Sequence, residues 1–382
     1  MTQKKIPFNW PHMTGKELSY IAEAHAYGHL AGDGYFTKKC SQWLEQRTGC
    51  YKALLTHSCT AALEMAAILA NIQPGDEVIM PSYTFVSTAN AFVLRGGVPV
   101  FVDIRPDTLN IDETLIESAI TKKTKAIVPV HYAGVACEMD VIMEIADRHG
   151  LIVIEDAAQG VLATYKGREL GSIGHLGCYS FHETKNIISG EGGALLINDP
   201  SLAERAEVIR EKGTNRSKFF RGEVDKYTWQ DLGSSYLPGE ITAAFLWAQM
   251  EQAAAITERR LGIWNNYHLS LVALEQKQKF RRPIVSMGCQ HNGHMYYLLM
   301  PNLEKRTYFI ERMNQLDINC VFHYVPLHSS PYGLKVGRFN KELVNTTDLA
   351  DHIVRLPLWL GLEKNQDRVI NEIYKAVDEV YL

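Results

Sequence analysis

The sequence predicts an α/β fold in which a mostly parallel sheet lies between layers of helices. Short apolar runs rich in β-branched residues (EVIMP, VFVDI, AIVPVHY and LIVIEDA) begin at residues 77, 100, 126 and 151. Helix-like stretches, such as 111–124 and 139–150, fill most of the intervals, and this alternation is typical of βαβ units. Because the strand-like runs are almost continuously apolar, we expect helices to cover both faces of the sheet.

Two further strands and a long helix are expected next along the chain. GCYSFH begins at Gly177 and GALLIND begins at Gly193, with no long helix between them. From about 202 to 271 the pattern becomes helical and charged, and its second part predicts one long helix over 241–270. The end of the chain reads as strand, helix and strand, in HMYYLLM, YFIERMNQ and NCVFHYVPL.

The chain of 382 residues is long enough for more than one domain, at roughly 150 residues each. The change of pattern predicts a large α/β domain over 1–250 and a smaller C-terminal α+β domain over 251–382. The long helix would join the two domains.

Composition and charge exclude several classes of protein. Hydrophobic residues make up 46% and charged residues 21% of the chain, which excludes disorder, collagen and coiled coil. The net charge is −4, so no overall positive field attracts nucleic acid or anionic lipid. No apolar run approaches the roughly 20 residues that span a bilayer, and the N-terminal segment lacks the apolar stretch of a secretion signal. We expect a cytoplasmic protein that binds neither nucleic acid nor membrane.

The cysteines favour a reducing compartment. There are seven, they are scattered, and none forms a C-x-x-C pair. Buried thiols are therefore expected rather than a disulfide scaffold, and no metal site is predicted.

A first candidate site precedes an Ala/Leu-rich helical segment in THSCTAALEMAAILAN, residues 56–71. Ser58, Cys59 and Thr60 stand where the helix would begin. A helix N-terminus with free N–H groups and a capping hydroxyl binds anions such as phosphate. The alternative is an ordinary helix cap, since serine and threonine are common there.

A second candidate is the carboxylate pair Glu155 and Asp156, at the end of the strand-like run LIVIEDA. Ligands of parallel sheets bind at the carboxyl ends of the strands. An acid at this place could hold a metal, a ribose hydroxyl or a protonated ring nitrogen. It could equally cap the following helix.

A third candidate is Lys185, in a polar segment between two strands and followed by Gly190, Gly192 and Gly193. Glycines allow close approach of the backbone, and a lysine held in such a pocket is a candidate to form a Schiff base. Taken alone, a single lysine is more often exposed to solvent. The three candidates together, in this order, match the requirements of pyridoxal phosphate: a phosphate anchor, an acid for the pyridine nitrogen and a lysine for the aldehyde.

The chain resembles the nucleotide-sugar aminotransferases of the DegT family, in the aspartate aminotransferase superfamily. The resemblance extends over nearly the full length and rests on GDGYFTKKCSQWLEQRTG, PGDEVIMPSYTFVSTANA, VPVHYAG, EDAAQG, GCYSFHETKN, EGGALLIND and VPLH. It implies the type I fold of pyridoxal phosphate-dependent transferases and a homodimer with active sites at the interface. It also implies transfer of an amino group from L-glutamate to a nucleotide-linked keto sugar.

The resemblance also assigns roles to individual residues. Lys185 would hold the cofactor and move protons, and Asp156 would pair with the pyridine nitrogen. Phe85 would stack on the ring, Gln159 would bind the phenolic oxygen, and Ser180 would bind the phosphate together with the backbone of Cys59 and Thr60. Family positions near the substrate are matched by Tyr324 and His328. The basic residues that could meet a nucleotide diphosphate are Lys212, Arg216 and Arg221.

One departure concerns the segment GSSYLPGEITAA. Many relatives have G-x-N-x-R there, and their asparagine reaches the phosphate of the neighbouring subunit. This chain has Ser235 and Leu237 in the asparagine and arginine positions, so that contact is lost or is made by Ser234 or Ser235.

Three other functions are less consistent with the sequence. Dehydratases of this fold replace the lysine with histidine, and Lys185 argues against that activity. A non-catalytic regulator would tolerate loss of Lys185 or Asp156, and both are present. A nicotinamide-dependent dehydrogenase needs a G-x-G-x-x-G turn after its first strand, which PGDEVIMPSYTF lacks.

Overall fold

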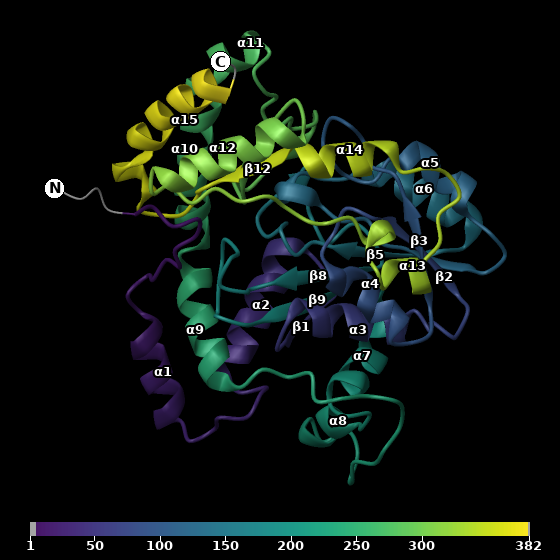
Figure 1. Cartoon of the computed structure of the whole chain (residues 1–382). Helices are drawn as coiled ribbons and strands as arrows, with labels where there is room; N and C mark the ends of the chain where they lie inside the picture. Colours follow the sequence, from purple (N-terminus) through teal and green to yellow (C-terminus); the bar gives the residue numbers. More distant parts are fainter. Residues whose placement is uncertain (1–4, 381–382) are drawn as a thin grey trace.

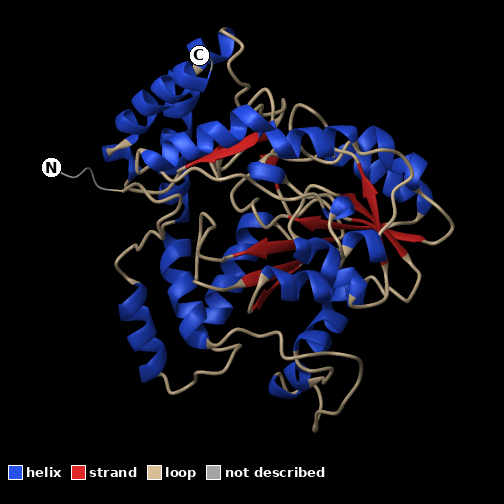
Figure 2. Cartoon of the chain, in the orientation of Figure 1, coloured by secondary structure: helices blue, strands red, loops and turns tan. Residues whose placement is uncertain are grey.

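A seven-stranded sheet forms the centre of the molecule. The computed structural model describes residues 5–380, and its main sheet has the order β1-β9-β8-β5-β4-β2-β3. The strands are β1 (Lys52–Thr56), β2 (Glu77–Pro81), β3 (Val98–Val102), β4 (Thr124–Ile127), β5 (Ile152–Asp156), β8 (Leu176–Ser180) and β9 (Gly193–Ile197). Figure 2 shows these strands enclosed by helices on both sides, as expected from their apolar sequences.

The sheet is mostly parallel, as predicted. Strands β3, β2, β4, β5 and β8 pair in parallel, whereas β9 runs antiparallel to both β8 and β1. The short β8–β9 connection explains the reversal, because a parallel pair needs a long crossover. Strand β1 is not predicted from the sequence, since the five residues KALLT carry too little periodicity to identify a strand alone.

Alternate residues of each strand pack into two different cores. Val78 and Met80 of β2 belong to a cluster with α3 (Cys59–Leu69), α4 (Val86–Val93) and α7 (Ala203–Arg210). Ile79 belongs to a cluster on the opposite face, whose helices are α2 (Tyr35–Thr48), α5 (Glu113–Ala119), α6 (Met139–His149) and α9 (Glu240–Glu251). This alternation follows from the two-residue period of a strand, which points successive side chains to opposite faces of the sheet.

The helix predicted over 241–270 is interrupted. The structure has α9 and then α10 (Ala253–Ser270), because Gln252 leaves helical geometry with φ −107 and ψ 8. Figure 1 shows the two helices as one broken column along the molecule, with α1 (Glu17–Ala26) beside α9.

Beyond α10, a two-stranded sheet packs with helices. Its strands are β11 (Tyr296–Leu299) and β12 (Ile353–Leu356), and its helices are α12 (Leu303–Gln315), α14 (Val344–His352) and α15 (Gln366–Val380). The strand expected in NCVFHYVPL does not form. Only Val321 bridges to Arg355, after which the chain turns inward toward a cavity.

The smaller elements complete the chain. They are β6 (Thr164–Tyr165), β7 (Arg168–Glu169), β10 (Cys289–Gln290), α8 (Arg216–Phe220), α11 (Val272–Gln276) and α13 (Gly333–Val336). All seven cysteines are free thiols. Within residues 5–380, no helix has the length and apolar character required to cross a membrane.

Candidate active site

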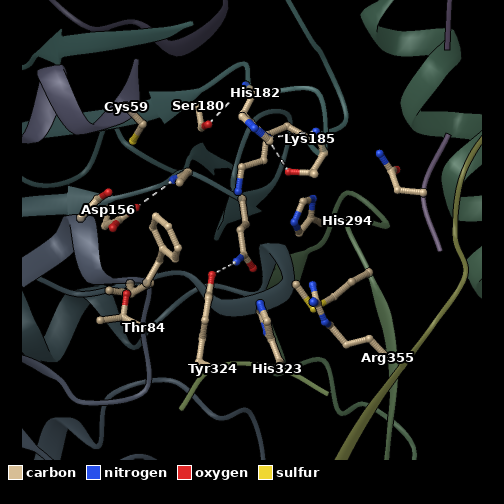
Figure 3. A pocket seen from close by; sticks show the side chains of 18 of the residues that line it. Cys59, Thr84, Asp156, Ser180, His182, Lys185, His294, His323, Tyr324 and Arg355 are labelled. Carbon is tan, nitrogen blue, oxygen red and sulfur yellow. Dashed lines mark hydrogen bonds between the residues drawn. The ribbon is translucent and has the colours of Figure 1, made fainter. Parts of the chain in front are cut away.

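A cavity of about 810 Å³ lies at the carboxyl ends of β5 and β8. It collects residues from distant parts of the chain, as Figure 3 shows. The residues singled out in the sequence that line it are Ser58, Cys59, Thr60, Phe85, Asp156, Gln159, Ser180, Lys185 and Tyr324. The three candidate segments therefore meet in one place.

The N-terminus of α3 provides the anion-binding end of this cavity. Ser58 is the N-cap, and its hydroxyl accepts a hydrogen bond from the N–H of Ala61 at 3.1 Å. The N–H groups of Cys59 and Thr60 lie in the first turn, where no carbonyl of the helix can accept them. Gly193 lies against this turn so closely that a Cβ there would stand 2.4 Å from the Cys59 nitrogen. These features fit a phosphate group.

Asp156, the last residue of β5, is a buried carboxylate without a positively charged partner. One oxygen accepts from the Thr88 hydroxyl at 2.7 Å and the other from the N–H of Ala158 at 3.1 Å. The Thr88 hydroxyl is itself hydrogen-bonded to that of Thr84 at 2.8 Å. No lysine, arginine or histidine among residues 5–380 forms an ion pair with Asp156. The site thus fits a protonated ring nitrogen, which would supply the missing positive charge.

The neighbouring carboxylate, Glu155, has a different environment. It is completely buried and accepts from His131 Nε2 at 2.8 Å and from the N–H of Gly171 at 2.8 Å. The N–H groups of Ile173 and Gly174 donate to its other oxygen, both at 2.6 Å. Glu155 is therefore fully satisfied by the protein and fixes the end of β5, whereas Asp156 remains available to a ligand.

Lys185 lies in the loop between β8 and β9 and extends into the centre of the cavity (Figure 3). Burial lowers the pKa of its amine, and the positive charge of Arg355 lowers it further, although Cys59 and Asp156 act in the opposite direction. A lowered pKa increases the fraction of neutral amine near neutral pH. The neutral form is the nucleophile that condenses with an aldehyde.

Gln159, Tyr324 and Phe85 form one wall of the cavity. The Gln159 amide oxygen accepts from the N–H of Ala133 at 2.6 Å, and its nitrogen donates to the Tyr324 hydroxyl at 3.2 Å. Residue Phe85 is 56% exposed, and the centroid of its ring lies 6.3 Å from that of the Tyr324 ring. Its exposed ring face is thus available to stack on a planar ligand.

The cavity is also lined by Arg260, His294, His323 and Arg355, which are not predicted from the sequence. His323 stacks on Tyr324 at 3.6 Å and shares a hydrogen bond of 2.7 Å with the Tyr132 hydroxyl. Burial holds the pKa of the His294 and His323 imidazoles well below the usual value. Two of these residues carry a sequence signal that could have placed them at the site. His323 directly precedes Tyr324, and Arg355 is a charged residue within the apolar run IVRLPL.

The remaining substrate candidates lie outside this cavity. His328 is hydrogen-bonded to the Ser82 hydroxyl at 2.7 Å and is not among the residues that line the cavity. Lys212 and Arg216 line a second cavity of about 770 Å³, together with Arg221, Ser235 and Leu237. Within one chain, these basic residues are therefore not placed beside Lys185.

Comparison with known proteins identifies the family. The model of the DegT/DnrJ/EryC1/StrS aminotransferase family matches residues 11–374. The chain belongs to this family. It is a pyridoxal phosphate-dependent sugar aminotransferase. The anion site at α3, the unpaired carboxylate of Asp156 and the buried amine of Lys185 fit that cofactor.

Individual relatives agree with this assignment. The GDP-perosamine synthase of Caulobacter vibrioides is 33% identical over 97% of this chain and 96% of its own length. The UDP-4-amino-4-deoxy-L-arabinose–oxoglutarate aminotransferase of Shewanella sediminis is 30% identical over 99% of each chain. The structure of Spr1654 from Streptococcus pneumoniae in its PMP form superposes with a TM-score of 0.91 over 99% of each chain, at 24% identity. This last similarity confirms the type I fold.

Proposed function

We propose that the protein transfers the amino group of L-glutamate to the 4-keto carbon of dTDP-4-keto-6-deoxy-D-glucose. The product would be dTDP-4-amino-4,6-dideoxy-D-galactose, for a cell-surface polysaccharide of the enterobacterial common antigen type. The cavity that joins Lys185 and Asp156 is the observation that carries transamination. The choice of sugar rests on THSCTA, VHYAGVACEMD and KGTNRS, which resemble segments of dTDP-4-amino-4,6-dideoxygalactose transaminases. The relative from Shewanella sediminis, named for a 4-amino sugar and oxoglutarate, supports the carbon and the donor.

The polar groups at the cofactor end of the cavity then have distinct roles. When bound, pyridoxal phosphate supplies an electron sink for negative charge at the substrate carbon. Lys185 holds the cofactor and, once released, moves a proton at that carbon through its Nζ. Asp156 keeps the ring nitrogen protonated by its charge, and the first turn of α3 binds the phosphate with Ser180. Phe85 covers the ring and Gln159 binds the phenolic oxygen.

In the proposed homodimer, the second cavity would form part of the partner's active site. Its basic residues, Lys212, Arg216 and Arg221, suit a nucleotide diphosphate but lie away from Lys185 in the same chain. A second copy that brings this cavity to the edge of the first would complete the site. Ser234 or Ser235 would then take the place of the asparagine that relatives extend to the partner's phosphate.

Product analysis tests the proposal. The enzyme, L-glutamate and dTDP-4-keto-6-deoxy-D-glucose should give a product whose mass and sugar-ring NMR spectrum show an axial 4-amino group, and Lys185→Ala should give none. The runner-up substrate is a 3-keto sugar, because a turned ring presents the neighbouring carbon to the same amine. Amination of the 3-keto isomer alone would contradict the assignment of the 4-keto carbon.

A further inference from the structure

His294 is a cavity-lining histidine to which the proposed reaction assigns no role. It lies just before β11 and is only 9% exposed. In the view of Figure 3, its ring stands beside the end of the Lys185 side chain, on the side away from Asp156. Buried polar groups are nearly always hydrogen-bonded, so the partners of its two ring nitrogens decide what this side chain can bind.

The hydrogen bonds of Asn186 fix the tautomer of His294. The Asn186 Nδ2 donates to the Asn292 carbonyl oxygen at 2.8 Å, and its Oδ1 faces the His294 Nδ1 at 3.0 Å. Because an amide oxygen can only accept, Nδ1 carries the proton of the neutral ring and Nε2 carries the lone pair. Within residues 5–380, Nε2 has no hydrogen-bond partner. His294 therefore presents an acceptor to the cavity.

The position of this acceptor is fixed by the backbone around it. The Asn292 Oδ1 accepts from the N–H of His294 at 3.1 Å, and the Asn292 Nδ2 donates to the Gln159 carbonyl oxygen at 2.8 Å. The segment is thus bonded to the loop that follows β5. Since Asn186 directly follows Lys185, the ring is also bonded to the loop that carries the reactive amine. A ligand atom that meets Lys185 has His294 as a neighbour.

The charges around His294 are positive. Burial lowers the pKa of its imidazole, and the charges of Lys185, Arg260 and Arg355 lower it further. The Arg260 guanidinium is held close, because its Nη2 donates to the His294 carbonyl oxygen at 2.7 Å. These charges disfavour a further ammonium group, and a carboxylate or a nucleotide diphosphate has no proton to donate at neutral pH. The donor that suits a neutral, lone-pair-bearing Nε2 in this place is a hydroxyl group.

We propose that the His294 Nε2 accepts a hydrogen bond from the sugar hydroxyl next to the keto carbon and so helps to select the acceptor sugar. The inference rests on the proposed function, because it names a contact of the same substrate. In dTDP-4-keto-6-deoxy-D-glucose, the keto carbon has a single neighbouring hydroxyl, on C3, since C5 carries the methyl group. L-glutamate has no hydroxyl, so the contact acts only in the half-reaction of the sugar.

Two substitutions separate the two ring nitrogens. His294→Asn can place an amide N–H where Nδ1 donates to Asn186, but it is too short to put an acceptor where Nε2 stands. His294→Gln can reach the position of Nε2 with its amide oxygen, but it loses the donor at Nδ1. The matched control is His149→Asn, since His149 is an exposed histidine paired with Glu117 on the surface.

The half-reaction that starts from the amine form of the cofactor tests the contact. Wild type should convert the 3-deoxy analogue of the keto sugar about 10- to 100-fold less efficiently than the parent sugar, because the analogue leaves a buried acceptor unpaired. In His294→Asn the parent sugar should lose most of this advantage, whereas His294→Gln should keep part of it and His149→Asn all of it. The half-reaction with L-glutamate should stay within about threefold of wild type in His294→Asn, because glutamate does not make the contact.

Binding of dTDP-6-deoxy-D-galactose, which has a hydroxyl in place of the keto group and cannot be aminated, gives a readout without turnover. By calorimetry, its 3-deoxy analogue should bind wild type at least about fivefold more weakly than the parent, and the two should bind His294→Asn equally. Circular dichroism identifies a variant that does not fold, in which case wild type and His294→Gln decide.

Two results would overturn the inference. One is equal use and equal binding of the parent and 3-deoxy sugars by wild type. The other is a His294→Asn variant that loses the half-reaction with glutamate but still prefers the parent sugar, which would show that the ring positions Lys185 instead. A wild type that distinguishes the 3-hydroxyl in binding but does not aminate the 4-keto sugar would refute the proposed function and leave the hydroxyl contact standing.

Discussion

The Glu155→Gln substitution should destabilise the protein strongly, although it changes a single atom. In the native structure, the Glu155 oxygen that faces His131 and Gly171 accepts a hydrogen bond from each. His131 must carry its proton on Nε2, because its Nδ1 accepts from the N–H of Cys137 at 3.2 Å. In Glu155→Gln, the amide oxygen can still accept from the N–H groups of Ile173 and Gly174. The amide NH₂ group then faces the N–H groups of His131 and Gly171, and it cannot accept a hydrogen bond from either.

Two buried donors then lose their acceptor. Each such loss costs about 1–3 kcal/mol, so the substitution should lower the free energy of unfolding by about 2–6 kcal/mol. That is a large part of the roughly 5–15 kcal/mol that typically stabilises a folded protein. Because Glu155 directly precedes Asp156, the affinity for pyridoxal phosphate should fall as well.

Urea denaturation of the cofactor-free protein measures this effect, followed by both tryptophan fluorescence and circular dichroism. The matched control is Glu144→Gln, which removes an exposed ion pair with Arg148 on α6 and should change stability by less than about 0.5 kcal/mol. If Glu155→Gln were no more destabilising than this control, the hydrogen-bond accounting at the end of β5 would be wrong.

The other predictions address the site directly. Asp156→Asn should slow the half-reaction with L-glutamate at least about 100-fold with an unchanged circular dichroism spectrum, because an amide cannot hold the ring nitrogen protonated; stopped-flow rates within a few-fold of wild type would assign Asp156 another role. Borohydride should fix the cofactor on the peptide that contains Lys185, and mass spectrometry that finds it elsewhere would refute the assignment. Ser58→Ala, which removes the cap of α3, should cost about 1 kcal/mol in urea denaturation and weaken cofactor binding. The pKa of His323 in the folded protein lies well below 6.5. Below pH 6.5 the unfolded chain therefore binds more protons than the folded protein, and the free energy of unfolding should decline by up to about 1.4 kcal/mol per pH unit. In His323→Gln this decline should be shallower, and an unchanged slope would contradict a neutral buried imidazole.

Local sequence signals were sufficient for much of the fold and for the cofactor end of the site. The strands β2 to β5 are short apolar runs that recur with helices between them. The segments around Ser58, Asp156 and Lys185 each carry a signal that is complete within a few residues. The meeting of these segments could be anticipated from the cofactor that all three fit, but not from the strand order alone, because β1, which precedes Ser58, is not predicted from the sequence.

The substrate end of the site could not be derived in the same way. His294, His323 and Arg355 come from separate segments around β11 and β12, and their convergence depends on packing that no short window contains. Charge alone was a poor guide to position, since Lys212 and Arg216 line a different cavity. The break at Gln252 is equally invisible in sequence, because the helical periodicity continues on both sides of it.

The contact between Gly193 and α3 has a consequence for how this enzyme can evolve. The φ angle of Gly193 is not positive, so its backbone conformation is one that any residue could adopt. What excludes other residues is the 2.4 Å approach of a Cβ to the Cys59 nitrogen. Even alanine would push the first turn of α3 away from the sheet and open the phosphate end of the cavity. Substitutions on β12, which lies away from this contact, leave the approach of Gly193 to α3 unchanged.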